Sequence, residues 1–219
     1  MGKKTHGPYL IAAIEYNDIT KVSDILSTKF RDKSNVKHFL VSEVRRLAFE
    51  YTAVPLLLAA TLPDPTILRY FVQKHEANIN HVHEYGCAKP RSRKTALLVA
   101  VRRGNHAMVD AILSMNADAN AADHKGRTPL HHAVKRADYR MAKLLLNRGA
   151  QTGLCDIGGD TPLHLATIFG HGELVKLIIH HGGDPYRAGQ LGAIPIHMAA
   201  RVSYGCLPVP GHNTHCDVH

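Results

Sequence analysis

The feature that most constrains this chain is a short motif that returns every 33 residues. Thr128-Pro129-Leu130-His131 recurs as Thr161-Pro162-Leu163-His164 and then as Ile194-Pro195-Ile196-His197, each time after a step of 33 residues. A looser copy, Thr95-Ala96-Leu97-Leu98, lies one step upstream. A period of this size predicts a stack of similar units, each of which buries its apolar face against its neighbours.

Each full unit is predicted to contain two successive helices. Thr128 and Thr161 can cap a helix, because the hydroxyl accepts a hydrogen bond from an otherwise unpaired amide. The proline that follows takes the first helical position, where no amide proton is missed. Gly149 and Gly182 fall where a helix end needs a positive φ. Apolar residues recur at helical spacing at Leu130, Ala133, Val134, Met141, Leu144 and Leu145, and again at Leu163, Ala166, Thr167, Leu174, Leu177 and Ile178.

The motif resembles the T-P-L-H-x-A pattern of the ankyrin repeat family, and the resemblance covers about residues 7–202. It implies an all-α solenoid of helix-turn-helix units with projecting hairpin loops, of about five repeats and a truncated sixth. We expect a divergent N-terminal repeat with an extra capping helix at 1–53, ankyrin repeats over 54–202, and a flexible tail containing Cys, His and Pro at 203–219. The predicted repeats span 54–94, 95–127, 128–160, 161–193 and, as a partial unit, 194–202.

The two ends depart from the repeat pattern. The first unit carries 14 extra residues, in which apolar positions predict an added helix. Those positions are Leu40, Val44, Leu47, Ala48 and Tyr51. After Ile194, a second helix is excluded by Pro208 and Pro210, which predicts a repeat cut short.

Histidine is abundant, with 17 in the chain, but five of these histidines have a structural explanation in the repeats. The resemblance implies that His131, His164 and His197 bond the motif threonine and tie neighbouring units together, and that His106 and His171 belong to turns. The tail holds Cys206, His212, His215, Cys216 and His219. Its spacing fits no zinc pattern and lacks a paired Cys-x2-4-Cys, so we predict no metal and no cofactor.

Lys and Arg outnumber Asp and Glu by 27 to 18, which gives a net charge of +9. One cluster of positive charge is the segment Lys89-Pro90-Arg91-Ser92-Arg93-Lys94. It is interpreted either as a solvated loop or as a nuclear-import or nucleic-acid patch, with Ser92 as a kinase target. The other falls on Arg102, Arg103, Lys135 and Arg136, at the eighth and ninth positions of two successive units. The resemblance implies that these positions line a concave binding surface.

We therefore predict a four-charge patch bordered by Ile168 and Phe169, which hold the same slots in the next unit. Mixed aromatic and Arg surfaces are typical of binding hot spots. Loop tips supply the other expected contacts: His124, Lys125, Arg127, Arg187 and Gln190. The predicted ligand is an acidic, partly hydrophobic protein segment.

No catalytic motif stands in the sequence: G-x-S-x-G, G-x4-G-K-[ST] and H-E-x-x-H are all missing. The longest apolar run, about 53–62, is too short to cross a membrane. We predict a non-enzymatic interaction module or adaptor, monomeric, in the cytoplasm or alternatively the nucleus. Two other functions stay open. One is a nucleic-acid-associated or nuclear factor, although no nucleic-acid motif is present. The other is a ubiquitin-ligase substrate adaptor in a longer form, since Leu207-Pro208-Val209-Pro210 resembles the LPxP element of a SOCS box.

Overall fold

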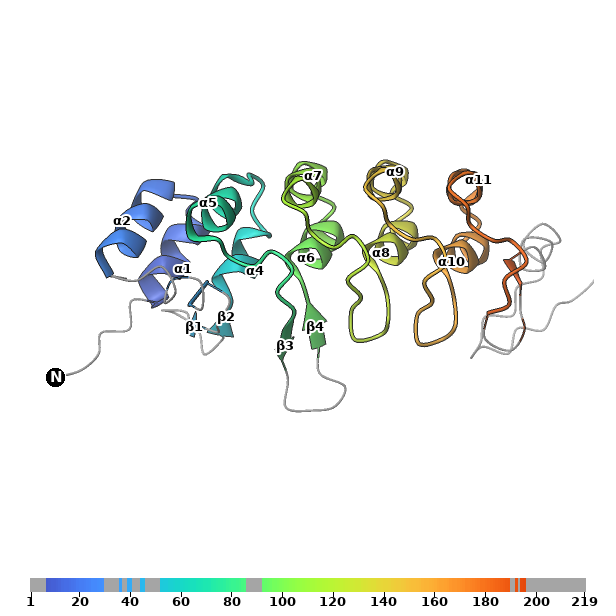
Figure 1. Cartoon of the computed structure of the whole chain (residues 1–219), viewed down its shortest axis with the longest axis horizontal. Helices are drawn as coiled ribbons and strands as arrows, with labels where there is room; N and C mark the ends of the chain where they lie inside the picture. The colour runs from blue at the N-terminus through green and yellow to red at the C-terminus, as the bar shows by residue number, and fades with distance from the viewer. Residues whose placement is uncertain are drawn as a thin grey trace, which may run out of the picture. The chain divides into compact units, whose positions relative to one another are not determined.

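The structure, a computed structural model, describes residues 7–29, 36, 39–40, 44–45, 52–85, 92–189, 192 and 194–195. The chain divides into two compact units, Met1–His124 and Lys125–His219, called here the N-terminal unit and the C-terminal unit. Both are built mainly from short helices arranged in pairs (Figure 1). The predicted helix-turn-helix architecture is thereby confirmed in each unit.

The described part of the N-terminal unit contains three helix pairs. They are α1 (Gly7–Glu15) with α2 (Ile19–Lys29), α4 (Pro55–Ala59) with α5 (Thr66–His75), and α6 (Ala96–Arg103) with α7 (His106–Ser114). The first helices of successive pairs pack together, α1 on α4 and α4 on α6, and α2 packs on α5. The largest buried side chains lie between these helices and include Leu10, Leu56, Phe71, Leu97 and Met108.

Two helix pairs make up the C-terminal unit as far as the structure describes it. They are α8 (Pro129–Lys135) with α9 (Tyr139–Asn147) and α10 (Pro162–Ile168) with α11 (Gly172–His180). Helix α8 packs beside α10, and α9 beside α11. Leu130, Leu145, Leu163 and Ile178 are buried between the pairs, as their spacing predicts.

The helix ends follow the predicted local chemistry. Pro129 and Pro162 stand at the first positions of α8 and α10, directly after the capping threonines. Gly149 and Gly182 adopt φ values of +86° and +85°, a conformation that glycine reaches without steric cost. In the part of the chain that the structure describes, no helix is long and apolar enough to cross a membrane.

Among the described residues of the N-terminal unit, two short pairs of strands interrupt the helical pattern (Figure 1). Strands β1 (Val44–Arg45) and β2 (Thr52–Ala53) pair antiparallel, with Val44 opposite Ala53. The helix predicted across Val44 is therefore wrong at that position, because the chain doubles back there to enter α4. Val36 and Leu40, which precede it, are helical and buried. Leu47, Ala48 and Tyr51 lie outside the described residues.

The second hairpin pairs β3 (His83–Tyr85) with β4 (Ser92–Lys94), with Glu84 opposite Arg93. The end of the basic segment, predicted as a loop, is thus a strand. The extra residues of this repeat lengthen the projecting turn into a β-ladder before α6 begins.

Asparagine side chains join neighbouring helix pairs in the N-terminal unit. The Asn105 amide donates to the carbonyl oxygens of Leu62 and Pro63, at 2.9 and 3.1 Å, while its Oδ1 accepts from the Met108 N–H that opens α7. One side chain therefore both caps a helix and binds the preceding repeat.

Candidate functional site

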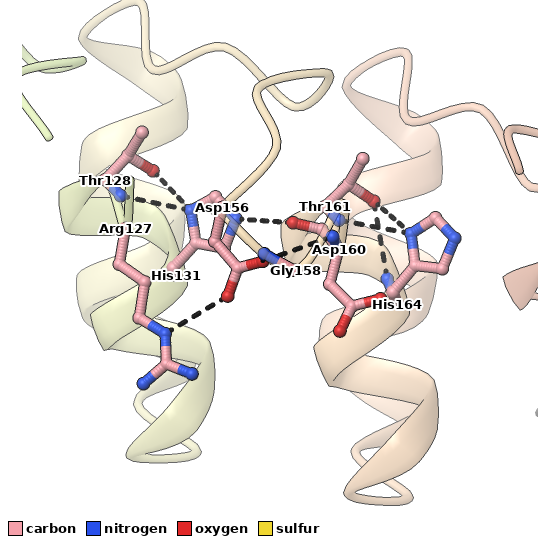
Figure 2. A network of polar contacts seen from close by, with 8 residues as sticks. All are labelled: Arg127, Thr128, His131, Asp156, Gly158, Asp160, Thr161 and His164. Carbon is pink, nitrogen blue, oxygen red and sulfur yellow. Dashed lines mark hydrogen bonds and ion pairs between the residues drawn. The ribbon is translucent and has the colours of Figure 1, made fainter. Parts of the chain in front are cut away.

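The motif histidine of α8 is a structural residue. His131 is fully buried, and its Nδ1 lies 3.1 Å from the Thr128 backbone nitrogen and 2.8 Å from the Thr128 hydroxyl (Figure 2). Its Nε2 lies 3.1 Å from the Asp160 carbonyl oxygen. A carbonyl can only accept, so Nε2 carries the proton and Nδ1 accepts from the threonine. The predicted tie between neighbouring repeats is confirmed at this residue.

The same arrangement recurs one repeat later. Nδ1 of His164 accepts from the Thr161 backbone N–H at 3.2 Å and lies 2.8 Å from its hydroxyl (Figure 2). The other side of this ring is approached by Gly189, where a Cβ would stand only 2.8 Å from Nε2. These contacts give both rings structural roles. His197 lies outside the described residues.

Burial controls the charge of this network. Loss of solvent lowers the pKa of His131, an effect that the Asp160 carbonyl and the Asp156 charge partly offset. Burial, together with the negative charge of Asp156, raises the pKa of Asp160, while His164 and Arg127 act against that rise. The neutral imidazole is thus the form that the folded protein favours.

Asp156 holds the loop before α10. Its Oδ1 accepts from the N–H groups of Gly158, at 2.8 Å, and Asp160, at 3.2 Å. Its Oδ2 pairs with Arg127 Nε at 3.2 Å (Figure 2), and the Asp156 side chain is only 6% exposed. Arg127, predicted as a partner contact, therefore has a structural partner inside the C-terminal unit.

The C-terminal unit brings together four of the predicted binding residues. Lys135 and Arg136 end α8, and Ile168 and Phe169 hold the equivalent positions at the end of α10. Because α8 and α10 pack side by side, these ends lie on adjacent helices, whose axes pack about 8–10 Å apart. Lys135 and Arg136 are exposed, Ile168 is half-buried, and Phe169 is 46% exposed. We call these four residues the helix-end patch.

A second surface that combines positive charge with an exposed apolar side chain lies at the loop tips. The Ile157 N–H donates to the Lys125 carbonyl at 2.9 Å, so the two loops touch, and Lys125 is exposed. Ile157 is 76% exposed, and sequence reasoning missed it. An apolar residue between Asp156 and two glycines, in an otherwise polar turn, was the available signal. We call Lys125 and Ile157 the loop-tip patch.

The other predicted contacts are distributed as follows. Arg102 and Arg103 are exposed at the end of α6 in the N-terminal unit, so the predicted quartet is divided between the two units. His124 is half-buried, and exposed Arg187 passes close to Gly153, where a Cβ would stand 3.2 Å from its guanidinium. Gln190 lies outside the described residues.

No group of three or more His, Cys, Asp or Glu side chains that could hold a metal ion is found among the residues that the structure describes. The five Cys and His residues of the tail lie beyond that part of the chain.

Comparison with known proteins agrees with the helical repeats. A model of three ankyrin repeats matches residues 56–156, and a model of a single ankyrin repeat matches residues 158–189. No curated protein matches this chain at a significant level. The two repeat models together span α4 to α11, including every capping threonine described above. The chain therefore belongs to the ankyrin repeat family.

Proposed function

We propose that this chain is a non-catalytic adaptor that binds an acidic, partly hydrophobic segment of another protein. Ankyrin repeats are generally protein–protein interaction modules. The helix-end patch is the proposed centre of binding, with the loop-tip patch of the same unit as a further contact.

The helix-end patch carries this proposal because it combines charge with exposed apolar area. Phe169 and Ile168 offer apolar surface next to the cations of Lys135 and Arg136. Arg and aromatic residues dominate binding energy at interfaces. Positive charge speeds the approach of an acidic partner. A ligand that alternates carboxylates with apolar side chains satisfies both halves of the patch.

The scaffold supports binding by a surface that is already formed. Capped helix ends hold Lys135 and Phe169 on short, packed helices rather than on an irregular segment. A preformed surface loses little conformational freedom on binding. Most of the conformational entropy lost on binding is then lost by the partner.

The experiment is affinity purification with mass spectrometry on three proteins. The first is the wild type and the second is Lys135→Glu with Arg136→Glu. The third, a matched control, is Arg140→Glu with Lys143→Glu, which makes the same charge change at exposed positions of α9. A partner held by the wild type and the control but lost from the second protein supports the proposal. Equal recovery from all three, with thermal melting showing each to be folded, contradicts it.

A second candidate function is association with nucleic acid or with nuclear complexes. It is favoured by the +9 charge and by Lys94, Arg102 and Arg103 in the N-terminal unit. A DNA or RNA affinity that falls steeply with added salt would support this alternative. The ubiquitin-ligase adaptor alternative rests on 207–210, outside the described residues. We place either function in the cytoplasm or the nucleus, with the chain acting as a monomer.

A further inference from the structure

The two faces of the β3–β4 hairpin differ in charge. Successive strand residues point to opposite faces, so Ser92 and Lys94 share one face while Arg93 points to the other. Arg93 is paired there with Glu84 across the hairpin, with Nε 3.4 Å from Oε1. The first face carries the Ser92 hydroxyl, the Lys94 ammonium and, opposite Lys94, the His83 imidazole.

Lys94, on the face with Ser92, is influenced by positive charge from α6. Burial and the nearby charge of Arg102 both lower the pKa of Lys94. Two cations are thus held close enough to repel each other. An anion placed beside them would relieve that repulsion. Ser92 is half-buried, and its Cα lies two strand residues, about 6.6 Å, from that of Lys94, within reach of a lysine side chain.

We propose that Ser92 is a phosphorylation site for a basic-residue-directed serine/threonine kinase, and that its phosphate is held by Lys94 and Arg102. The Ser92 Oγ attacks the γ-phosphorus of ATP, and the Oγ–P bond forms as the bond to the ADP oxygen breaks. The hydroxyl proton passes to the base of the kinase, and ADP leaves. The sequence Arg91-Ser92-Arg93-Lys94 supplies the charge pattern by which such kinases select substrates.

The phosphate would change the N-terminal unit locally. It brings a charge of about −1.5 to −2 and strong acceptor oxygens. Ion pairs from β4 to α6 would then fasten the hairpin to the first helix of its repeat. This inference concerns only the N-terminal unit, and the proposed partner of the helix-end patch plays no part in it.

The first experiment incubates the full chain with ATP and a basic-residue-directed serine/threonine kinase and maps the phosphate by mass spectrometry. We expect phosphate at Ser92, its loss in Ser92→Ala, and normal incorporation in Ser114→Ala, which alters a serine at the end of α7. Absence of phosphate at Ser92, or equal incorporation in Ser92→Ala, overturns the acceptor assignment.

The second experiment tests the phosphate contacts. Phosphoserine is placed at position 92 by codon expansion, and its second ionisation is followed by phosphorus NMR. Nearby cations should lower this pKa by about 0.5 from its ordinary value near 6. Lys94→Gln and Arg102→Gln should each restore it in part, whereas Arg93→Gln, on the opposite face, should change it least. An ordinary value, or equal shifts in all three variants, overturns the assignment of Lys94 and Arg102.

Discussion

The Nε2 atom of His131 lies 3.1 Å from the carbonyl oxygen of Asp160, a residue 29 positions further along the chain. This contact joins the first helix of one repeat to the residue before the capping threonine of the next. The other ring nitrogen is the one that requires a neutral ring, because Nδ1 accepts from the Thr128 backbone N–H and could not do so once protonated. The imidazole thus links two repeats through Nε2 and caps its own helix through Nδ1, and only the second contact is lost on protonation.

Acid should weaken the C-terminal unit through His131. Its pKa is below the ordinary 6.5 when folded, so the unfolded chain binds the proton first as pH falls. Stability should be full above pH 6.5 and should decline from there down to the folded pKa. Asp160, whose ordinary pKa is 3.8, acts in the opposite direction and at lower pH. Urea unfolding between pH 5 and 8 should show this slope.

His131→Gln should flatten that slope, although the variant is less stable at every pH. His180→Gln, at an exposed position on α11, is the matched control and should keep the wild-type slope. An unchanged slope in His131→Gln would contradict the assignment of acid sensitivity to this ring.

The two residues of the Arg127–Asp156 ion pair should contribute unequally to the free energy of unfolding. Asp156→Ala should cost about 2–3 kcal/mol of unfolding free energy, because the backbone amides of Gly158 and Asp160 lose their acceptor as well. Arg127→Ala should cost about 1 kcal/mol, since this side chain is partly exposed. A double-mutant cycle by urea unfolding measures the coupling. Equal costs for the two variants would mean that the carboxylate serves the ion pair alone.

Two glycines with the same backbone conformation should respond differently to alanine. Gly149, at φ +86°, has nothing within 4 Å of a Cβ, so Gly149→Ala should cost about 1 kcal/mol from backbone strain alone. At Gly126, φ +72°, a Cβ would stand 3.1 Å from both Asp156 Cα and Ile157 N. Gly126→Ala should therefore cost at least about 1 kcal/mol more. Similar melting temperatures for the two variants would show that the loop containing Asp156 and Ile157 moves aside for the Cβ without an energetic cost.

The two roles of Asn105 can be separated by substitution. Asn105→Asp keeps the oxygen that caps α7 but removes the amide that donates to Leu62 and Pro63. Asn105→Ala removes both. We expect a loss of about 1 kcal/mol from the aspartate variant and about 2 kcal/mol from the alanine variant. Hydrogen exchange at the Met108 amide gives the second readout: protection should fall in the alanine variant and persist in the aspartate variant.

The sequence predicts the repeats where each unit keeps its own local signals. Thr161, Pro162 and Gly182 occupy the positions expected of a cap, a first helical residue and a left-handed helix end. The cap, the first helical residue and the helix end depend on neighbours within a few residues, which the sequence displays directly. The roles of His131 and His164 were implied by the family resemblance, because the contact of His131 with Asp160 crosses 29 residues.

Features that depend on contacts between segments were harder to foresee. The pairing of Val44 with Ala53 needs two segments to meet, and helical spacing at Leu40 and Val44 pointed to the wrong structure. Arg127 was expected to face a partner because its loop is variable in this architecture. Its bond to Asp156 crosses 29 residues, and no local pattern marks it. The exposure of Ile157 depends on how its loop lies against Lys125, which the residues beside it do not specify.

The β3–β4 hairpin shows how this chain tolerates added length. The repeat that carries it has a longer loop, yet α6 still begins at a threonine whose hydroxyl accepts from the Leu98 N–H and still ends at a left-handed glycine, Gly104. Growth of the loop therefore leaves the helices on either side intact. A foreign epitope or fluorescent reporter inserted between Tyr85 and Ser92 should leave α5 and α6 folded, which makes the segment between the two strands a suitable attachment point for a probe.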